Sequence, residues 1–462
     1  MTTASATTTA GAVRGRRIGR VVHFAGVPFA SAARFASPEA PRPWLGTRDA
    51  SSPGPIAPQP AGRLERVMGP MRAGRQNENC LTLNLWTPSV VDGARPVLVW
   101  IHGGGFSSGS GSAEWYDGTL LAERSDLVVV TINYRLGVLG FAHLDSLAPS
   151  NRGLLDMVAA LDWVQDNIAA FGGDPADVTV AGQSGGAVSI VPLLGRGLFR
   201  RAILQSAPFA VLPWSSEEAG EFTAMLCAEL GLARPASLFD VPVNRLLDAQ
   251  RAVTEAITRA SPNPLNVAPP FQLVTDELVG EELISTALNR PRPEVDLLIG
   301  WTRDELAAFV GGDERFAAID AETVIRAIRQ WYGGEAEQRY ADRLSQLPEA
   351  ATPAQVALAI TTDEVFRRGA LRLAAAFPGS VTYRFDWRPT GSPFGACHCL
   401  DIPFVFGNAA AWRDAPMLPG GELPGRLAEA VRTTWTAFIR GDQLPGRSGD
   451  DPIMFGECTI AN

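Results

Sequence analysis

The chain has 462 residues, of which 46% are apolar and 19% are charged, and its formal net charge is −9. This length allows a large buried core, and the acidic balance lacks the positive footprint that nucleic-acid binders usually carry. Every basic residue is an arginine, so chemistry that needs a lysine amine, such as a P-loop or a pyridoxal Schiff base, is excluded.

Strands and helices alternate along most of the chain, and most of the expected strands are continuous runs of Val, Ile and Leu. Such runs are typical of strands that are buried on both faces of an α/β sheet. Helices are expected over 154–168, where apolar residues recur at helical spacing, and over 426–440. Strands are expected at 81–86, 96–101, 127–132, 178–181, 201–204, 295–299 and 381–385. This alternation predicts βαβ units and a mostly parallel central sheet flanked by helices.

Two long segments, 216–290 and 313–377, are expected to be mainly helical. Because no internal repeats are present, we interpret residues 1–462 as one α/β catalytic domain that carries these segments as helical insertions. Residues 49–78, rich in Pro, Gly and Arg, are expected to form a long loop, and loops of that length are often close to functional sites.

The cysteines are odd in number and widely scattered, which argues against a disulfide scaffold. They are Cys80, Cys227, Cys397, Cys399 and Cys458. No apolar run is long enough to span a membrane, and the N-terminus shows no apolar targeting segment. We therefore expect a cytoplasmic protein without a membrane or nucleic-acid partner, and take a monomer as the default.

A Gly-x-Ser-x-Gly motif, Gly182-Gln183-Ser184-Gly185-Gly186, lies between an expected buried strand and a helix. At such a junction a sharp turn holds the serine exposed, and its neighbours must be small. The start of the following helix offers free N–H groups that favour an oxyanion. A phosphate-binding glycine loop is the alternative, but the lysine and the glycine spacing that it needs are missing. Ser184 is therefore the candidate nucleophile.

The base must be a histidine. The candidates are His23, His102, His143 and His398. Hydrolases with a serine on a strand-to-helix turn follow the order serine, acid, histidine, and only His398 comes after Ser184. Its imidazole would be the base that a serine hydroxyl needs, and activity should rise as the ring loses its proton. Cys397 and Cys399 flank this histidine, but the spacing is too tight for a zinc knuckle, so no metal is expected.

A glycine run, His102-Gly103-Gly104-Gly105-Phe106, closes another expected buried strand. Glycine lets the main chain approach a substrate closely, and such a run presents N–H groups to a developing oxyanion. We expect the oxyanion hole to consist of the N–H groups of Gly104, Gly105 and Gly185. A plain flexible loop is the alternative.

Several longer motifs, in their order along the chain, resemble the type-B carboxylesterase family, a branch of the α/β-hydrolases that includes the cholinesterases. They are Gly26 through Ala30, Asn77 through Pro88, Trp100 through Phe106, Asn133 through Gly137, Asn167 through Pro175, and Gly395 through His398. The resemblance, which extends to bacterial para-nitrobenzyl esterases, implies an α/β-hydrolase fold with helical insertions over the active site. It also implies a glutamate acid in a Gly-x-x-x-Asp-Glu turn, which assigns that role to Glu305. The residues alone leave Asp304 as an equal rival.

The resemblance implies a serine carboxylesterase that cleaves small-molecule esters through an acyl-enzyme and needs no cofactor. Amide or carbamate hydrolysis by the same triad is the alternative, and a non-catalytic binding relative is a remote one. Many members carry Glu before the nucleophile and Ala after it, where this chain has Gln183 and Gly185. We expect Phe106, Gln183 and Trp214 to line the substrate pocket, with an ordinary core position equally open for Trp214.

Overall fold

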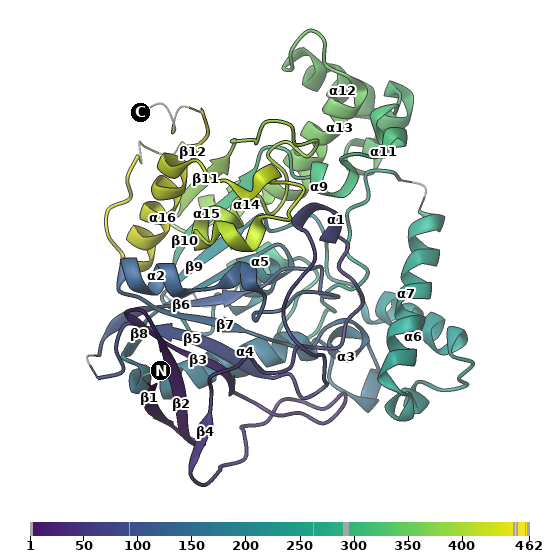
Figure 1. The fold of residues 1–462 in the computed structure, drawn as a ribbon. Helices are drawn as coiled ribbons and strands as arrows, with labels where there is room; N and C mark the ends of the chain where they lie inside the picture. The colour runs from purple at the N-terminus through teal and green to yellow at the C-terminus, as the bar shows by residue number, and fades with distance from the viewer. Residues whose placement is uncertain are drawn as a thin grey trace.

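A computed structural model of the chain describes residues 3–91, 93–261, 263–289, 295–446, 449, 451–457 and 459, so Cys458 lies outside the described residues. One large sheet forms its centre (Figure 1), with the strand order β1-β2-β3-β5-β7-β6-β8-β9-β10-β11-β12 and β4 paired with β2. The strands are β1 (Thr3–Thr8), β2 (Gly11–Ile18), β3 (Val21–Pro28), β4 (Thr47–Asp49), β5 (Thr82–Thr87), β6 (Arg95–Ile101), β7 (Val128–Ile132), β8 (Gly173–Gln183), β9 (Arg201–Gln205), β10 (Asp296–Thr302), β11 (Val381–Phe385) and β12 (Ile453–Phe455).

Neighbouring strands from β7 to β12 are parallel, which confirms the mostly parallel sheet expected from the sequence. The antiparallel strands β1, β2, β3 and β5 extend the sheet at its N-terminal end, and β5 pairs antiparallel with β7. All of the strands expected from the sequence are present, as β5 through β11.

Alternate residues of the central strands enter two apolar layers, one on each face of the sheet. Along β6, Val99 points into one layer and Trp100 into the other, and both are fully buried. The helices that contribute to these layers include α4 (Arg152–Asn167) and α5 (Gly185–Ile190) on the Val99 side, and α2 (Thr119–Ser125) and α16 (Gly425–Arg440) on the Trp100 side. Because both faces are covered, both sets of side chains must be apolar, which explains the uninterrupted apolar runs.

The two expected insertions are largely helical, and Figure 1 shows α6 and α7 beside the sheet and α11 to α13 beyond it. The first holds α6 (Ser216–Glu229), α7 (Val243–Ala260) and α8 (Leu283–Asn289), and the second holds α10 (Glu314–Ala317), α11 (Ala321–Tyr332), α12 (Ala336–Ser345), α13 (Pro353–Thr361), a π-helical turn (Thr362–Arg367) and α14 (Arg368–Ala376). Residues 263–282, between α7 and α8, are irregular. Pro264, Pro269 and Pro270 account for this, since proline lacks the N–H that a helix interior needs.

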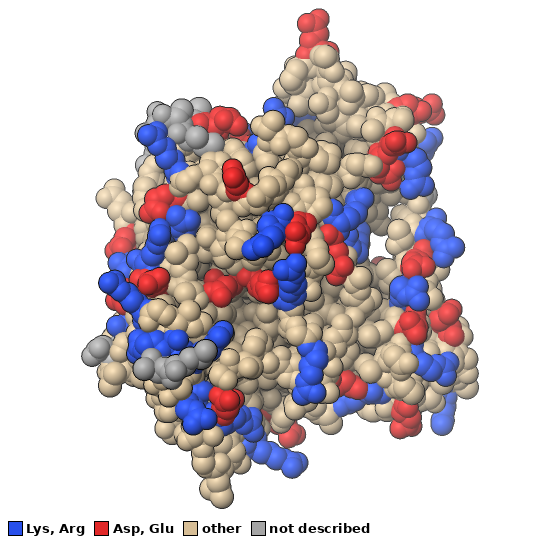
Figure 2. All heavy atoms as spheres, viewed as in Figure 1, with Lys and Arg blue, Asp and Glu red and all other residues tan. Residues whose placement is uncertain are grey.

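The remaining α-helices are short. They are α1 (Glu65–Met68), α3 (Gly137–Phe141), α9 (Ala307–Val310) and α15 (Ile402–Phe406). The expected loop at 49–78 is irregular apart from α1. Figure 2 shows arginine and acidic side chains intermixed on the face in view. Within the described ranges, we find no helix with the length and apolarity to cross a bilayer.

Candidate active site

Three parallel strands deliver candidate residues to one edge of the sheet. β6 leads into the glycine run, β8 into Ser184, and β10 into the turn that holds Glu305. His398 lies on the loop after β11, which pairs with the loop after β10 through a bridge between Asp304 and Cys397. The carboxyl edge of parallel strands is the usual position of a site in α/β folds.

Ser184 has a backbone conformation that side chains other than glycine rarely adopt, with φ 56° and ψ −123°. Its N–H donates to the Gln205 carbonyl at 2.9 Å, which holds the turn in place. A Cβ at Gly182 would lie 2.6 Å from the carbonyl carbon of Gly186, and one at Gly186 would lie 2.2 Å from the Ile101 oxygen. The small neighbours are therefore a packing requirement of this strained turn, as the motif predicted.

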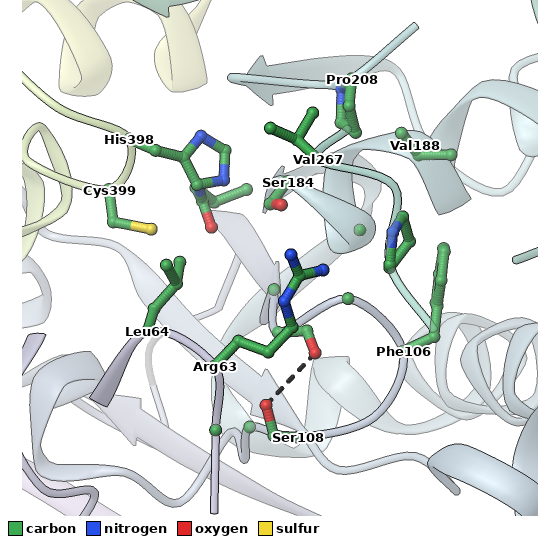
Figure 3. Close-up of a pocket in the computed structure, with 18 of the residues that line it drawn as sticks. Arg63, Leu64, Phe106, Ser108, Ser184, Val188, Pro208, Val267, His398 and Cys399 are labelled. Carbon is green, nitrogen blue, oxygen red and sulfur yellow. Dashed lines mark hydrogen bonds between the residues drawn. The ribbon is translucent and has the colours of Figure 1, made fainter. Parts of the chain in front are cut away.

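The Ser184 hydroxyl is available for chemistry. Figure 3 shows Ser184 and His398 facing the same cavity, which both residues line. Among the described residues, the hydroxyl makes no hydrogen bond, either to His398, whose Nε2 contacts Gln183, or to another group.

The imidazole of His398 is held by Glu305. Nδ1 of His398 lies 2.5 Å from Oε2 of Glu305, and both side chains are fully buried. The second Glu305 oxygen, Oε1, accepts a hydrogen bond from the N–H of Thr302 at 2.8 Å, which fixes the carboxylate. Asp304 has other partners: it pairs with Arg303 at 2.8 Å and accepts from the N–H of Ala396 at 2.9 Å. The geometry thus brings Glu305, and not Asp304, to the imidazole.

Gln183 makes a contact that sequence reasoning missed. Its side-chain Nε2 lies 2.9 Å from Nε2 of His398. In a neutral ring whose Nδ1 donates to the Glu305 carboxylate, Nε2 carries the lone pair and accepts from the amide. The sequence singled out Gln183 as a pocket-lining residue beside Ser184, and not as a partner of the imidazole.

The three expected oxyanion donors lie together. A Cβ built at Gly185 would lie 3.6 Å from the Gly105 nitrogen, so these two residues are adjacent across the turn. Gly104 and Gly105 have φ values of +118° and +58°, which favour glycine. Within the described chain, no carbonyl or side chain accepts a hydrogen bond from the N–H groups of Gly104, Gly105 or Gly185.

The cavity in front of Ser184 is mostly apolar. Its lining includes Leu64, Met68, Val188, Leu212, Val267 and Phe366. Phe106 and Gln183 also line it, whereas Trp214 does not. Trp214 lies beside a neighbouring groove, where its ring packs 5.6 Å from that of Phe222 and its backbone N–H donates to Leu273. Although Trp214 follows β9 closely in sequence, it does not line the cavity.

A second buried polar group behind the site was also missed. Asp401 is fully buried, and its Oδ2 accepts hydrogen bonds from the Gln205 amide at 2.9 Å and the Tyr383 hydroxyl at 2.8 Å. Burial raises the pKa of Asp401. Gln205 also fixes the Ser184 N–H, so this network supports the nucleophile turn from behind. Its position three residues after His398 was the available sequence signal.

The two cysteines beside His398 stay protonated. Burial raises the pKa of Cys397 and of Cys399 well above the ordinary thiol value. Metal ligation needs thiolates, so these thiols are poor ligands. No group of three His, Cys, Asp or Glu side chains arranged to hold a metal occurs in the described part of the chain.

Comparison with known families decides the assignment. The model of the carboxylesterase family matches residues 2–452. This chain belongs to the carboxylesterase family.

This carboxylesterase is 41% identical over 449 residues to a Rhodococcus erythropolis protein named "Probable N-octanoylanthranilate hydrolase", over 94% of this chain and 92% of that protein. It is 34% identical over 456 residues to the para-nitrobenzyl esterase of Bacillus subtilis, over 95% and 90%. Among solved structures, a carboxylesterase of Geobacillus stearothermophilus matches with a TM-score of 0.82 and 34% identity, over 98% and 96%. These similarities confirm the α/β-hydrolase fold and the resemblance to type-B carboxylesterases, and identify a carboxylic-ester hydrolase.

Proposed function

We propose that this carboxylesterase hydrolyses small-molecule esters through an acyl-enzyme on Ser184, with His398 as the base and Glu305 as the acid of the triad. The observation that carries this proposal is the buried 2.5 Å contact between His398 Nδ1 and Glu305 Oε2, together with the cavity that His398 and Ser184 both line. A serine hydroxyl is a weak nucleophile until a neighbouring base takes its proton, and an imidazole oriented by a carboxylate is such a base.

The reaction has two halves that use the same imidazole. Ser184 Oγ attacks the ester carbonyl while its proton passes to His398 Nε2, and His398 then protonates the departing alcohol. A water molecule, deprotonated by the ring, attacks the acyl-enzyme, and the ring then returns that proton to Ser184 Oγ as the carboxylic acid leaves. Glu305 orients the ring and stabilises its cation without taking the proton. Because Nε2 is in contact with the amide of Gln183, that amide has to move aside when Ser184 transfers its proton.

Each tetrahedral intermediate carries a negative oxygen that needs hydrogen-bond donors. The free N–H groups of Gly104, Gly105 and Gly185 are proposed to bind it. Donors of this kind are fixed before the reaction begins, and one of them typically contributes ~2.7–4 kcal/mol to the transition state.

Covalent labelling tests the nucleophile directly. A fluorophosphonate should modify the wild-type protein at Ser184, and peptide mass spectrometry should find the adduct in the peptide that contains Gly182 through Gly186. Ser184→Ala should remain folded, remain unlabelled and lose esterase activity. An adduct on another residue, or no adduct on an active preparation, would refute the assignment.

Amide hydrolysis is the second candidate, because the triad does not fix the leaving group. The similarity to a protein named for N-octanoylanthranilate favours it, since an N-octanoyl group is joined through an amide. Matched substrates decide between the two, such as para-nitrophenyl butyrate and the butyryl anilide of the same ring. A rate of anilide hydrolysis that equals or exceeds the rate of ester hydrolysis would favour amides as the substrates.

We also propose that the chain acts as one catalytic domain in the cytoplasm. Both insertions supply residues to the Ser184 cavity, Val267 from the first and Phe366 from the second, so they are interpreted as parts of the site. Cys80, Cys227 and the two cysteines beside His398 are buried and unbridged, which is typical of a reducing compartment.

A further inference from the structure

One cation faces the proposed reacting groups without an ionic partner. Arg63, on the irregular segment before α1, lines the Ser184 cavity, and Figure 3 shows its guanidinium directed into it. Nη1 of Arg63 donates to the Ala268 carbonyl at 3.0 Å. In the described part of the chain, no carboxylate lies at ion-pair distance from this guanidinium, which therefore keeps most of its five N–H groups available.

Nearby charges do not neutralise Arg63. Glu65 is the acidic side chain among the described residues that line the cavity, and its Oε1 accepts from the N–H of Gly62 at 3.2 Å. Arg66 donates to the Phe309 carbonyl. Loss of water around Arg63 and the positive charge of Arg66 lower the pKa of Arg63, but a guanidinium stays charged in proteins. Arg63 is thus a permanent cation that is exposed to solvent and lines the cavity.

Arg63 lies on the side of the cavity where the leaving group departs, because Arg63 and His398 both lie against the Phe309 ring. Cζ of Arg63 lies 5.5 Å from the centroid of the Phe309 ring, and the same ring lies 5.4 Å from that of His398. His398 protonates the departing alcohol in the proposed mechanism, so the alcohol half of the substrate must lie beside the imidazole of His398. Figure 3 shows Phe106 and Val188 across Ser184 from His398, on the side left for the acyl half.

We propose that Arg63 forms an anion-binding subsite for the alcohol half of the substrate, so that the enzyme prefers esters whose leaving group carries a carboxylate. This inference rests on the proposed roles of Ser184 and His398. A planar guanidinium binds a carboxylate through two parallel hydrogen bonds, which are stronger than bonds between neutral groups. The apolar lining provides no comparable partner for a neutral leaving group.

Two matched esters test the subsite: the butyrate of 4-hydroxybenzoate, which is anionic, and the butyrate of 4-hydroxybenzamide, which is neutral and similar in shape. The kcat/KM of each is measured on the wild type, on Arg63→Gln and on Arg75→Gln. Arg75 is exposed on the same segment and does not line the cavity, so its replacement removes an equal charge away from the site. Because both esters are compared on one preparation, the folded fraction cancels in their ratio.

We expect the anionic-to-neutral ratio to fall about 10-fold or more in Arg63→Gln and to change less than about twofold in Arg75→Gln. Added salt should also reduce the wild-type ratio, because it screens the attraction. Equal ratios in the wild type and Arg63→Gln, with the neutral ester still hydrolysed, would overturn the subsite alone. A wild type that hydrolyses neither ester would overturn the proposed function as well.

Discussion

The side-chain amide of Gln183 is in contact with the imidazole nitrogen of His398 that the proposed mechanism reserves for Ser184, at a distance of 2.9 Å. Glu305 holds the other ring nitrogen, so the imidazole is fixed by a hydrogen bond at each end. The residue before the nucleophile thus touches the catalytic base directly. Its charge should therefore determine how readily that base is protonated.

Gln183→Glu tests this coupling. A carboxylate beside the ring favours the protonated imidazole, so the base becomes neutral only at higher pH. We expect the acidic limb of the kcat/KM profile to move upward by about one pH unit, measured with para-nitrophenyl butyrate between about pH 5 and 9. Gln183→Met removes the hydrogen bond without adding charge and should show no upward shift. An unchanged or downward-shifted limb in Gln183→Glu would contradict the coupling.

Replacement of the two neighbouring acids separates their roles. Glu305→Gln keeps the shape of the side chain but removes the charge that stabilises the imidazolium, so kcat should fall about 10³- to 10⁴-fold. Asp304→Asn weakens the contacts to Arg303 and the N–H of Ala396, so it should lower the melting temperature and reduce kcat less than about tenfold. Steady-state kinetics and thermal unfolding measure both effects. Equal losses of kcat would show that the geometry has not identified the acid.

The parts of the fold that local patterns specify were predictable from sequence. Continuous apolar runs placed strands such as β6 and β7, because a strand buried on both faces must be apolar on both. The strand at 81–86 was expected from its alternating pattern to be half-buried, whereas β5 is buried on both faces. The Gly-x-Ser-x-Gly motif placed Ser184 at a strand-to-helix turn for a steric reason that the structure shows directly. The expectation that 216–290 is mainly helical agrees with α6, α7 and α8, but it did not locate the irregular residues 263–282, which contain three prolines.

Contacts between distant segments were not predictable from one sequence. The bond from Gln183 to His398 joins residues 215 positions apart, and the bond from Arg63 to Ala268 joins residues 205 apart. Neither contact can be recognised from a local sequence pattern, since both contacts depend on how loops pack at the edge of the sheet. Trp214 is the opposite case, an expected contact that is absent. Its sequence position near β9 suggested that it lines the cavity, but its ring packs beside another groove.

Gly185 and Gly186 should respond in opposite ways to the same added methyl group. A Cβ at Gly185 would meet its nearest neighbour, Phe106, at 3.5 Å, an ordinary contact, whereas one at Gly186 would lie 2.2 Å from the carbonyl oxygen of Ile101. Gly185→Ala keeps the proposed N–H donor, so it should retain kcat/KM within about threefold and stabilise the fold by ~0.4–1 kcal/mol. Gly186→Ala should destabilise by ~1–3 kcal/mol or more. Comparable melting temperatures for the two variants would contradict the described turn.

Two buried histidines should make the fold sensitive to acid. Burial lowers the pKa of His23 and of His102 to about 4, from an ordinary value of 6.5. Between these values the unfolded chain binds protons that the folded chain does not, so stability is complete above about pH 6.5 and is lost as the pH falls toward 4. Each histidine can contribute up to ~3 kcal/mol of this loss.

His23→Phe isolates one of the two contributions. The His23 ring stacks on Trp86 with centroids 4.5 Å apart, and its nitrogens have no hydrogen-bond partner among the described residues. Phenylalanine can preserve this packing and cannot be protonated. We expect His23→Phe to lose less melting temperature than the wild type between about pH 7 and 4, with His102 still accounting for part of the decline. If the melting temperatures of both proteins fall by the same amount, the folded state tolerates a charged His23, and burial of this ring does not cause the acid sensitivity.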